Sequence, residues 1–195
     1  MLVDYPSLRR LLRRQARGAD GAPSGHTRNA VCLLLVDRDE TEAVLIQKAD
    51  TNGYHWRDHV ALPGGRIEPA DASPQEAALR ELHEELGIPR GDVEVVGCLG
   101  HFQTRTSKHD LEVIVARWTG RSALQVDPRE IARVFEVPLR QLADLHVQAG
   151  FRSRPEPELG EALVYALPDA EIWGVTARIL HCFLEECGEH LHGST

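Results

Sequence analysis

The sequence predicts a single α/β domain, and three features of its 195 residues support this fold class. Short β-rich runs bounded by glycine, proline or charged residues alternate with segments that have helical periodicity. Hydrophobic residues make up 42% of the chain, which is enough to bury a core. Because no internal repeat or long linker divides the sequence, we expect a basic helix and loop over residues 1–25 and one domain over residues 26–195.

The first segment, residues 6–17, reads as an amphipathic helix. Three leucines form a short apolar stripe, and residues 1–18 carry five arginines against one aspartate. The stripe favours a helix that docks on the domain with its basic face in solvent, although such a face also suits an anionic surface or a phosphate-bearing ligand. Residues 18–25 are rich in glycine, alanine and proline, which indicates a loop.

The middle of the chain reads mainly as strands. Residues 30–36 and 43–47 are β-rich and flank a charged turn, so we expect them to pair. A polar stretch at residues 51–59 leads into a short apolar run at 60–62. Further strand candidates lie at residues 93–98, 111–118, 134–137 and 162–166. A last apolar stripe with helical spacing predicts a closing helix over residues 169–190.

Residues 73–87 carry clear helix signals. Ser73 suits the N-cap, Pro74 suits the first helical position, and Glu76 is placed to complete a capping box. Gly87 marks the end of the helix. Small and apolar side chains form one face, and three glutamates share a different arc: Glu81, Glu84 and Glu85.

This acidic patch has two interpretations. In the first, the patch is simply a solvated acidic face. Without a counter-charge, like charges four residues apart destabilise a helix by roughly 0.2–0.5 kcal/mol per pair. A bound divalent cation reverses the effect, and Mg²⁺ prefers carboxylates, waters and substrate phosphate oxygens. Gly64 and Gly65 favour the metal, because glycine permits close approach of a ligand. Arg80 can pair with Glu76 or Glu84 and hold the patch in place.

Together these positions resemble the Nudix box, Gly-x5-Glu-x7-Arg-Glu-apolar-x-Glu-Glu-x-Gly-apolar, which here reads GRIEPADASPQEAALRELHEELGI. Asp71 replaces the first glutamate, and eight residues rather than seven separate it from Arg80. The resemblance implies an α/β/α sandwich with a mixed central sheet, a loop–helix–loop catalytic motif and a long C-terminal helix. It also implies hydrolysis of a diphosphate linkage in a nucleoside diphosphate joined to another group, with Mg²⁺ or Mn²⁺ as cofactor.

By position, the resemblance implies that Glu81 and Glu85 are the principal metal ligands. Glu84 would be a further ligand or a base, the Gly65 carbonyl another ligand, and Arg80 the residue that orients the carboxylates. Such metals neutralise diphosphate oxygens and lower the pKa of a bound water, which fits this chemistry.

Several residues outside the box are further candidates. Glu130, in an acidic turn, is the expected general base, with an ordinary surface glutamate as the alternative. Four basic residues are candidates for substrate contacts: Lys48, Arg57, Arg105 and Lys108. For the last two, the alternative is a solvated loop. Trp173, near the start of the closing helix, is expected to pack rather than to stack on a base.

The change at Asp71, the extra residue before Arg80 and the late segment 172–177 look like the coenzyme A diphosphatase branch. That branch carries two upstream arginines, and Lys48 and Arg57 lie near but not at their places. The resemblance therefore implies coenzyme A or an acyl derivative as substrate, cleaved to 3′-phosphoadenosine 5′-phosphate and 4′-phosphopantetheine. ADP-ribose or a nucleoside-diphosphate sugar is the alternative substrate, and a non-catalytic nucleotide-binding module is the alternative of another class.

Composition limits the classes of partner that we expect the chain to bind. The net charge of −8 argues against broad phosphate-backbone binding, and residues 65–87 hold six acidic against two basic residues. No apolar run approaches the roughly 20 residues that cross a bilayer, and the four cysteines form no CxxC pair. We expect a cytoplasmic protein with a small nucleotide-derived substrate and neither a nucleic-acid nor a membrane partner. A homodimer stays open, since many relatives dimerise.

Overall fold

The structure is a computed structural model that describes residues 2–15, 26–49, 59–105, 108–120 and 123–188. The strands are β1 (Thr27–Asp37), β2 (Thr41–Lys48), β3 (Val60–Ala61), β4 (Gly64–Arg66), β5 (Val93–Gln103), β6 (His109–Trp118), β7 (Ile131–Pro138), β8 (Tyr165–Leu167) and β9 (Ala170–Ile172). The α-helices are α1 (Tyr5–Gln15), α2 (Pro74–Leu86), α3 (Leu139–Gln148), α4 (Glu156–Leu159) and α5 (Gly174–Cys187).

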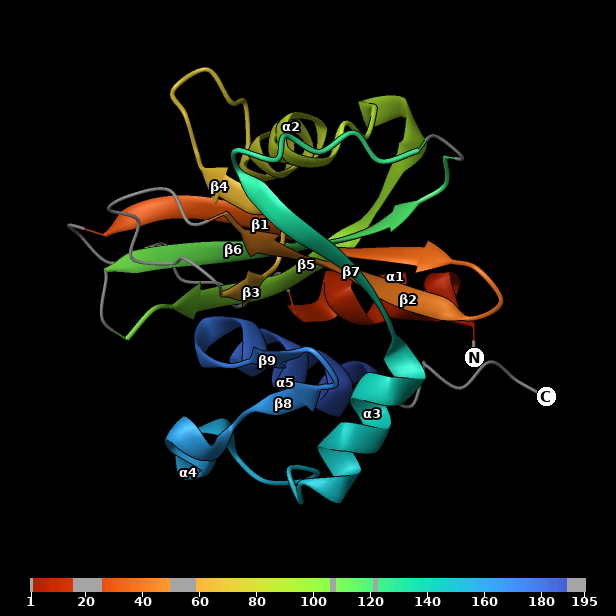
Figure 1. Ribbon diagram of the computed structural model, residues 1–195, viewed down its shortest axis with the longest axis vertical. Helices are drawn as coiled ribbons and strands as arrows, with labels where there is room; N and C mark the ends of the chain where they lie inside the picture. Colours follow the sequence, from red (N-terminus) through yellow and green to blue (C-terminus); the bar gives the residue numbers. More distant parts are fainter. Residues whose placement is uncertain (1, 16–25, 50–58, 106–107, 121–122, 189–195) are drawn as a thin grey trace.

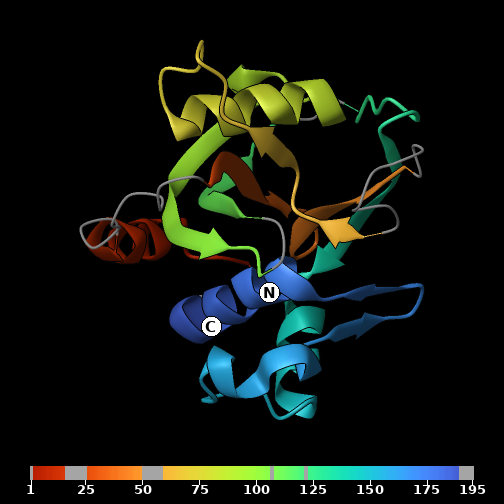
Figure 2. The ribbon, with the colours of Figure 1, turned by 90° about the vertical axis from the view of Figure 1, so that its left-hand side faces the viewer.

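The described residues form a seven-stranded mixed sheet between two helical layers (Figure 1). Helix α2 covers one face of the sheet, and α3, α4 and α5 lie on the opposite side (Figure 2). The central path is β3-β2-β1-β6-β5, in which β1 and β6 are parallel and the other neighbours are antiparallel. This architecture confirms the predicted α/β/α sandwich with a mixed sheet.

Strand β1 is buried on both faces. Its residues alternate between two hydrophobic clusters: Leu33 and Leu35 pack toward α1, α3 and α5, while Cys32 and Leu34 pack toward α2. Burial on both sides explains why the sequence of this strand is continuously apolar rather than alternating.

One edge of β1 is shared by two strands, and this sharing positions the site. Residues 29–31 pair with β4, whereas residues 34–37 pair with β2 on the same edge. The sheet therefore divides along β1. The start of β4 and the end of β2 at Lys48 both border the pocket that lies at this divide.

Helix α1 docks on the sheet as the apolar stripe predicts. Leu8 and Leu12 are fully buried, and a Cβ at Gly97 of β5 would lie 2.7 Å from Leu12 Cβ, so glycine lets the helix approach closely. Arg9 on the outer side pairs with Glu94 at 2.6 Å. The predicted loop at residues 18–25 lies outside the described residues, and the domain boundary at residue 25 stays a prediction.

Two expected elements differ from the structure, and the helices α3 and α4 are not among the expected elements. The strand expected over residues 162–166 is wrong at its start, because Gly160–Ala162 forms a 3-10 turn and pairing begins at Tyr165. The closing helix begins at Gly174 rather than at residue 169, because Ala170–Ile172 pairs with Tyr165–Leu167 in the β8–β9 hairpin. None of the described helices combines the length and apolar character that a membrane span requires.

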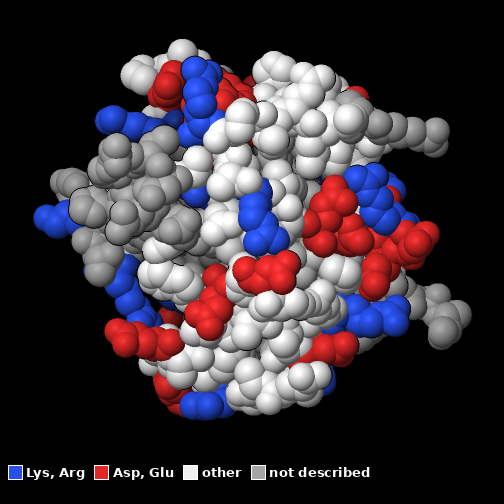
Figure 3. Space-filling model, in the orientation of Figure 1, with Lys and Arg blue, Asp and Glu red and all other residues white. Residues whose placement is uncertain are grey.

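The surface charge is mixed on the face that Figure 3 shows, where acidic and basic side chains lie next to one another in several places. Ion pairs of exposed side chains join Arg38 to Glu136 at 3.1 Å and Arg133 to Asp169 at 3.3 Å. The net negative charge of the chain is thus not spread over this face as one acidic field.

Candidate active site

The boundaries of α2 are set by its capping residues. The Ser73 side chain accepts a hydrogen bond from the Glu76 N–H at 3.2 Å, which confirms the predicted N-cap. Gly87 ends the helix with φ 67°, and its N–H donates to the His83 carbonyl at 3.0 Å. These caps fix which turns of the helix carry the carboxylates.

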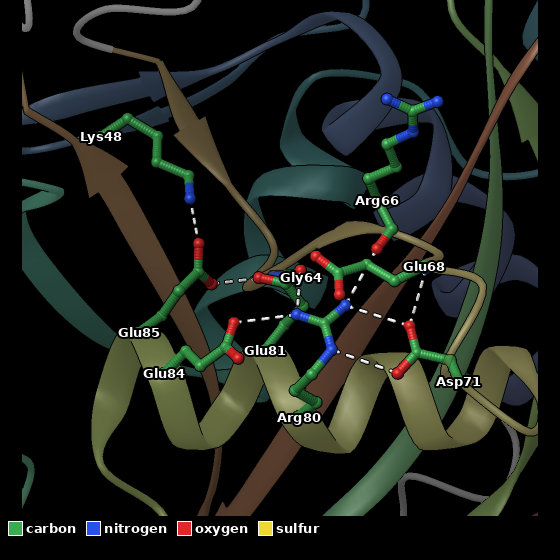
Figure 4. A network of polar contacts seen from close by, with 9 residues as sticks. All are labelled: Lys48, Gly64, Arg66, Glu68, Asp71, Arg80, Glu81, Glu84 and Glu85. Carbon is green, nitrogen blue, oxygen red and sulfur yellow. Dashed lines mark hydrogen bonds and ion pairs between the residues drawn. The ribbon is translucent and has the colours of Figure 1, made fainter.

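Arg80 ties the acidic patch to the preceding loop (Figure 4). Its guanidinium donates to both Asp71 carboxylate oxygens at 3.1 Å, to Glu81 Oε1 at 2.9 Å and to Glu84 Oε2 at 2.8 Å. It also donates to the Arg66 carbonyl at 3.0 Å. One side chain therefore holds three carboxylates and the loop backbone, which is the fork geometry that distinguishes arginine from lysine.

Of the two partners that the sequence allowed for Arg80, the structure shows Glu84. Glu76 instead pairs with Arg90, which follows the helix. Asp71 reaches Arg80 in spite of the extra residue between them, and the hydrogen bonds from Arg80 lower the pKa of Asp71. The two departures from the Nudix pattern thus leave this contact intact.

Glu85 is buried at the centre of the site, with 2% of its surface exposed. Its Oε1 pairs with the Lys48 ammonium, and its Oε2 accepts a hydrogen bond from the Gly64 N–H at 2.9 Å (Figure 4). Burial raises the pKa of Glu85, although the positive charge of Lys48 opposes that shift. Lys48 and the backbone together compensate a charge that would otherwise be costly to bury.

Glu81 lies against the glycine pair of β4. A Cβ at Gly65 would lie 2.4 Å from Glu81 Oε1, so a side chain at this position would displace the carboxylate. Gly64 adopts φ 144°, and a Cβ there would meet the Ala30 carbonyl at 2.4 Å. Burial raises the pKa of Glu81, with Arg80 acting in the opposite direction. The site therefore holds two carboxylates whose negative charge a further cation would stabilise.

The described residues do not form a complete preformed cage for a hard divalent cation. Among the described residues, no three acidic, histidine or cysteine side chains converge closely enough to enclose an ion. Mg²⁺ needs less, because it is typically held by one or two carboxylates together with waters and substrate phosphates. Glu81 and Glu85 supply oxygen donors of this kind, and the missing side chain at Gly65 leaves room for the Glu81 carboxylate.

The other two acidic candidates lie nearer to solvent. The Glu84 side chain is 52% exposed. Glu130 is exposed as well, and its carbonyl accepts a hydrogen bond from the Ala49 N–H at 2.8 Å. That bond places the Glu130 backbone beside the end of β2, next to the strand residue Lys48 that pairs with Glu85.

A pocket of about 170 Å³ opens beside the carboxylates. Its lining includes Lys48, Gly64 and Gly65 on one side and the first turn of α5 on the other. Trp173 borders the pocket with 47% of its surface exposed, and its ring lies edge-to-face with His59 at a centroid distance of 4.0 Å. Trp173 thus packs on His59, while 47% of its surface stays exposed, and the expectation that it packs rather than stacks on a base stays a prediction.

Two polar side chains in the pocket have a defined orientation. Asn29 Nδ2 donates to the Thr27 carbonyl at 2.9 Å, which fixes the amide, and the same nitrogen lies 2.9 Å from His109 Nδ1. His109 Nδ1 must accept this second hydrogen bond, so the neutral ring carries its proton on Nε2. The Asn29 oxygen takes no hydrogen bond within the described part of the chain.

The structure brings only part of the predicted substrate-binding set to the pocket. Lys48 lines it, whereas Arg105 and Lys108 do not. Arg105 pairs with Glu156 at 3.0 Å, and its neighbour Thr104 borders the pocket instead. Arg57 lies outside the described residues. Sequence reasoning missed Asn29 and the pocket-lining role of His109, since neither residue stands in a recognisable motif.

Comparisons with known proteins agree with this geometry. Residues 26–157 match the family described as the NUDIX domain. The chain is 30% identical over 159 residues to a protein of Photorhabdus laumondii named as an uncharacterized Nudix hydrolase, NudL, covering 81% of this chain and 84% of the relative. A NudL protein of Shigella flexneri is 34% identical over 147 residues, covering 74% of this chain and 72% of the relative.

A solved structure shows the same fold. The MutT/nudix family protein from Enterococcus faecalis superimposes with a TM-score of 0.57 and 16% sequence identity, covering 92% of this chain and 69% of that protein. The family match, the relatives and the Arg80-centred carboxylates on α2 lead to one conclusion. The chain belongs to the Nudix family, whose members are hydrolases of nucleoside diphosphate derivatives that generally use divalent metal ions.

Proposed function

We propose that this chain is a Mg²⁺- or Mn²⁺-dependent diphosphatase that cleaves coenzyme A or acyl-coenzyme A to 3′-phosphoadenosine 5′-phosphate and a 4′-phosphopantetheine product. The observation that carries the proposal is the buried Glu85 carboxylate, whose partners Lys48 and Gly64 both line the pocket. Lys48 and the Gly64 N–H offset part of the cost of burying this carboxylate; a divalent cation would further stabilise the charges of Glu81 and Glu85, and a diphosphate would bring the remaining oxygen ligands.

In this proposal Glu81 and Glu85 hold the metal, with Glu84 and the Gly65 carbonyl as further oxygen donors. The bound ion supplies charge neutralisation of the diphosphate and activation of a water. Arg80 keeps the carboxylates in register through its hydrogen bonds to Glu81 and Glu84. These contacts hold the metal-binding oxygens in place before substrate arrives.

Two further residues act on the substrate and the water. Lys48 reaches into the pocket from the end of β2, and its ammonium binds a diphosphate oxygen once Glu85 is neutralised by a cation. Glu130 is the proposed general base, and its backbone contact with Ala49 supports a position at the same end of β2.

The choice of coenzyme A rests on the late segment around Trp173. Trp173 and Thr176 border the same pocket as Gly64 and Gly65, so the late segment that resembles the coenzyme A diphosphatase branch lies beside the start of the Nudix box. A second substrate class is favoured by one observation. Lys48 is the one lysine or arginine among the described residues that line the pocket. Because the 3′-phosphate of coenzyme A calls for more positive charge, ADP-ribose and nucleoside-diphosphate sugars are the second candidates.

A product assay separates these candidates. The full chain is incubated with Mg²⁺ or Mn²⁺ and with coenzyme A, acetyl-coenzyme A, ADP-ribose, a uridine diphosphate sugar or a nucleoside triphosphate, and products are resolved by chromatography. The proposal predicts cleavage of coenzyme A at the diphosphate, and Glu85→Gln controls for contaminating hydrolases. Cleavage of ADP-ribose with coenzyme A untouched supports the second class. Failure to cleave any of them favours a non-catalytic binding module.

A further inference from the structure

We propose that the pocket beside Trp173 binds the nucleobase of the substrate, which stacks on the exposed part of the Trp173 ring. The inference rests on the proposed function, because it assigns the pocket to one half of a nucleoside diphosphate derivative. The pocket is assigned to the nucleobase and not to the group on the other side of the diphosphate.

The place of the pocket makes it suitable for a group attached to the diphosphate. Lys48, Gly64 and Gly65 line the pocket and also contact or abut the carboxylates of Glu81 and Glu85. A diphosphate at those carboxylates therefore leaves one of its two substituents directly at the pocket entrance.

The aromatic rim favours a flat ring. His59 contacts Trp173 edge-to-face at an interplanar angle of 61°, and 47% of the tryptophan surface remains exposed. A large exposed aromatic side chain is unusual on a folded protein unless it serves a contact. Bases stack on such rings because each base has a π-face.

The polar groups of the pocket suit the fixed edge of a base. Asn29 offers its amide oxygen as an acceptor, and His109 offers Nε2–H as a donor. A nucleobase edge presents donors and acceptors that can pair with both. The amide and hydroxyl groups of a pantetheine arm can pair as well, but a flexible arm loses more conformational freedom on binding than a rigid ring does.

The remaining residues that line the pocket favour an uncharged ligand group. Val31, Leu111 and Val175 are apolar, and none of the described residues that line the pocket is aspartate or glutamate. The pocket therefore suits an uncharged ring, while the charged phosphates stay beside Lys48.

Binding of half-substrates tests the inference without hydrolysis. Isothermal titration calorimetry is carried out in the absence of divalent metal with three probes: adenosine 5′-monophosphate, ribose 5-phosphate and 4′-phosphopantetheine. We expect the monophosphate that carries adenine to bind best to the unmodified chain. Trp173→Ala should weaken its binding by about tenfold, and Trp173→Phe by less than about threefold, because base–aromatic stacking supplies that difference.

Controls separate loss of stacking from loss of fold. Val147→Ala removes an equally exposed apolar side chain on α3, away from the pocket, and should leave binding of adenosine 5′-monophosphate unchanged. Ribose 5-phosphate should bind equally to the unmodified chain and to Trp173→Ala. Thermal unfolding midpoints of all variants establish that they are folded.

The outcomes separate failure of the nucleobase assignment from failure of the proposed function. Tighter binding of 4′-phosphopantetheine than of adenosine 5′-monophosphate, or equal binding of the monophosphate to the unmodified chain and Trp173→Ala, overturns the nucleobase assignment even if hydrolysis is observed. Binding of the monophosphate that depends on Trp173 without hydrolysis of any diphosphate sustains the assignment and overturns the proposed function.

Discussion

Two clusters of polar side chains lie on opposite sides of the sheet, and they hold carboxylates in different ways: Glu85 is buried with 2% of its surface exposed, whereas the Glu185 side chain is 28% exposed. The α2 cluster consists of Lys48, Arg80, Glu81, Glu84 and Glu85, of which Lys48 lines the pocket. The C-terminal cluster consists of His146 on α3, Tyr165 on β8, and His181 and Glu185 on α5.

Hydrogen bonds connect most of the C-terminal cluster, while His181 Nδ1 is buried without a hydrogen-bond partner among the described residues. His146 is 3% exposed; its Nε2 donates to Glu185 at 2.8 Å, so its Nδ1 accepts from the Tyr165 hydroxyl at 2.8 Å. The Ser153 N–H donates to the other Glu185 oxygen at 2.9 Å. These bonds connect three elements of the C-terminal layer, which is a structural use of polar residues.

The carboxylate pKa values reflect this contrast. Burial pushes the pKa of Glu185 upward, but hydrogen bonds from His146 and Ser153 outweigh it and lower the pKa. For Glu81 and Glu85 burial prevails over Arg80 and Lys48, and the pKa of each is raised. Glu85 already has Lys48 and the Gly64 N–H as partners, but the raised pKa values of Glu81 and Glu85 mean that a further cation would favour their ionised forms. This response to added positive charge, rather than the number of acidic residues, is what we expect of a metal site.

The largest expected effect is on turnover. Glu85→Gln removes the buried charge but keeps an oxygen that can accept the Gly64 N–H. We expect kcat to fall at least ~100-fold, or about 2.7 kcal/mol of transition-state stabilisation. Glu185→Gln, the same substitution in the C-terminal cluster, is the matched control and should change kcat by less than about threefold. Equal kcat values for both variants would remove the functional distinction between the clusters.

A smaller effect is expected on stability when Lys48 is replaced. Lys48→Met leaves Glu85 buried without its cation, which should lower the free energy of unfolding without metal by about 2 kcal/mol. Excess Mn²⁺ should restore most of this loss, because a metal supplies the missing charge. Urea unfolding with and without Mn²⁺ measures both quantities. A loss that Mn²⁺ does not restore would mean that Lys48 acts on the fold and not on the charge of Glu85.

The smallest expected effect is the pH dependence of the C-terminal cluster. Burial, and then the nearby His146, lower the pKa of His181 in the folded chain. The unfolded chain therefore takes up a proton at His181 near pH 6.5 while the folded chain does not, so stability falls as pH drops below about 6.5. Glu185 adds a second loss at lower pH, because its folded pKa is lowered and its contribution disappears as pH falls through that value.

The pH prediction is checked by unfolding midpoints between about pH 7.5 and 5.5. His181→Gln removes the titrating group and should reduce the slope in this window, with a difference of about 1 kcal/mol or less. Glu156 also faces His181, and Tyr165 and Glu185 surround His146, so the same slope is measured in Glu156→Gln as a control. An unchanged slope in His181→Gln would assign the pH dependence to another group.

The sequence predicted the parts of the site that lie on one element. The caps of α2 are local features, and the contact of Arg80 with Glu84 follows from helical spacing. Spacing alone does not separate Glu84 from Glu85, although one is 52% exposed and the other 2%, because that difference depends on how α2 sits against β2 and β4.

The pocket could not be read from the sequence because its polar groups come from distant strands and a helix. Asn29 lies on β1 and His109 on β6, and neither stands in a recognisable motif; Trp173, before α5, stands in the segment that resembles the coenzyme A diphosphatase branch, but its place at the pocket depends on the fold. Arg105 and Lys108, expected to contact substrate from the loop at residues 101–110, illustrate the same limit, since Arg105 pairs with Glu156 and Thr104 borders the pocket instead.

Binding of Mn²⁺, followed by electron paramagnetic resonance of the free ion, tests most directly whether the α2 cluster is a cation site. We expect the unmodified chain and Glu185→Gln to bind Mn²⁺ equally, and the double variant Glu81→Gln, Glu85→Gln to bind it at least about tenfold more weakly. Equal Mn²⁺ affinity in all three proteins would mean that the α2 cluster is not a cation site.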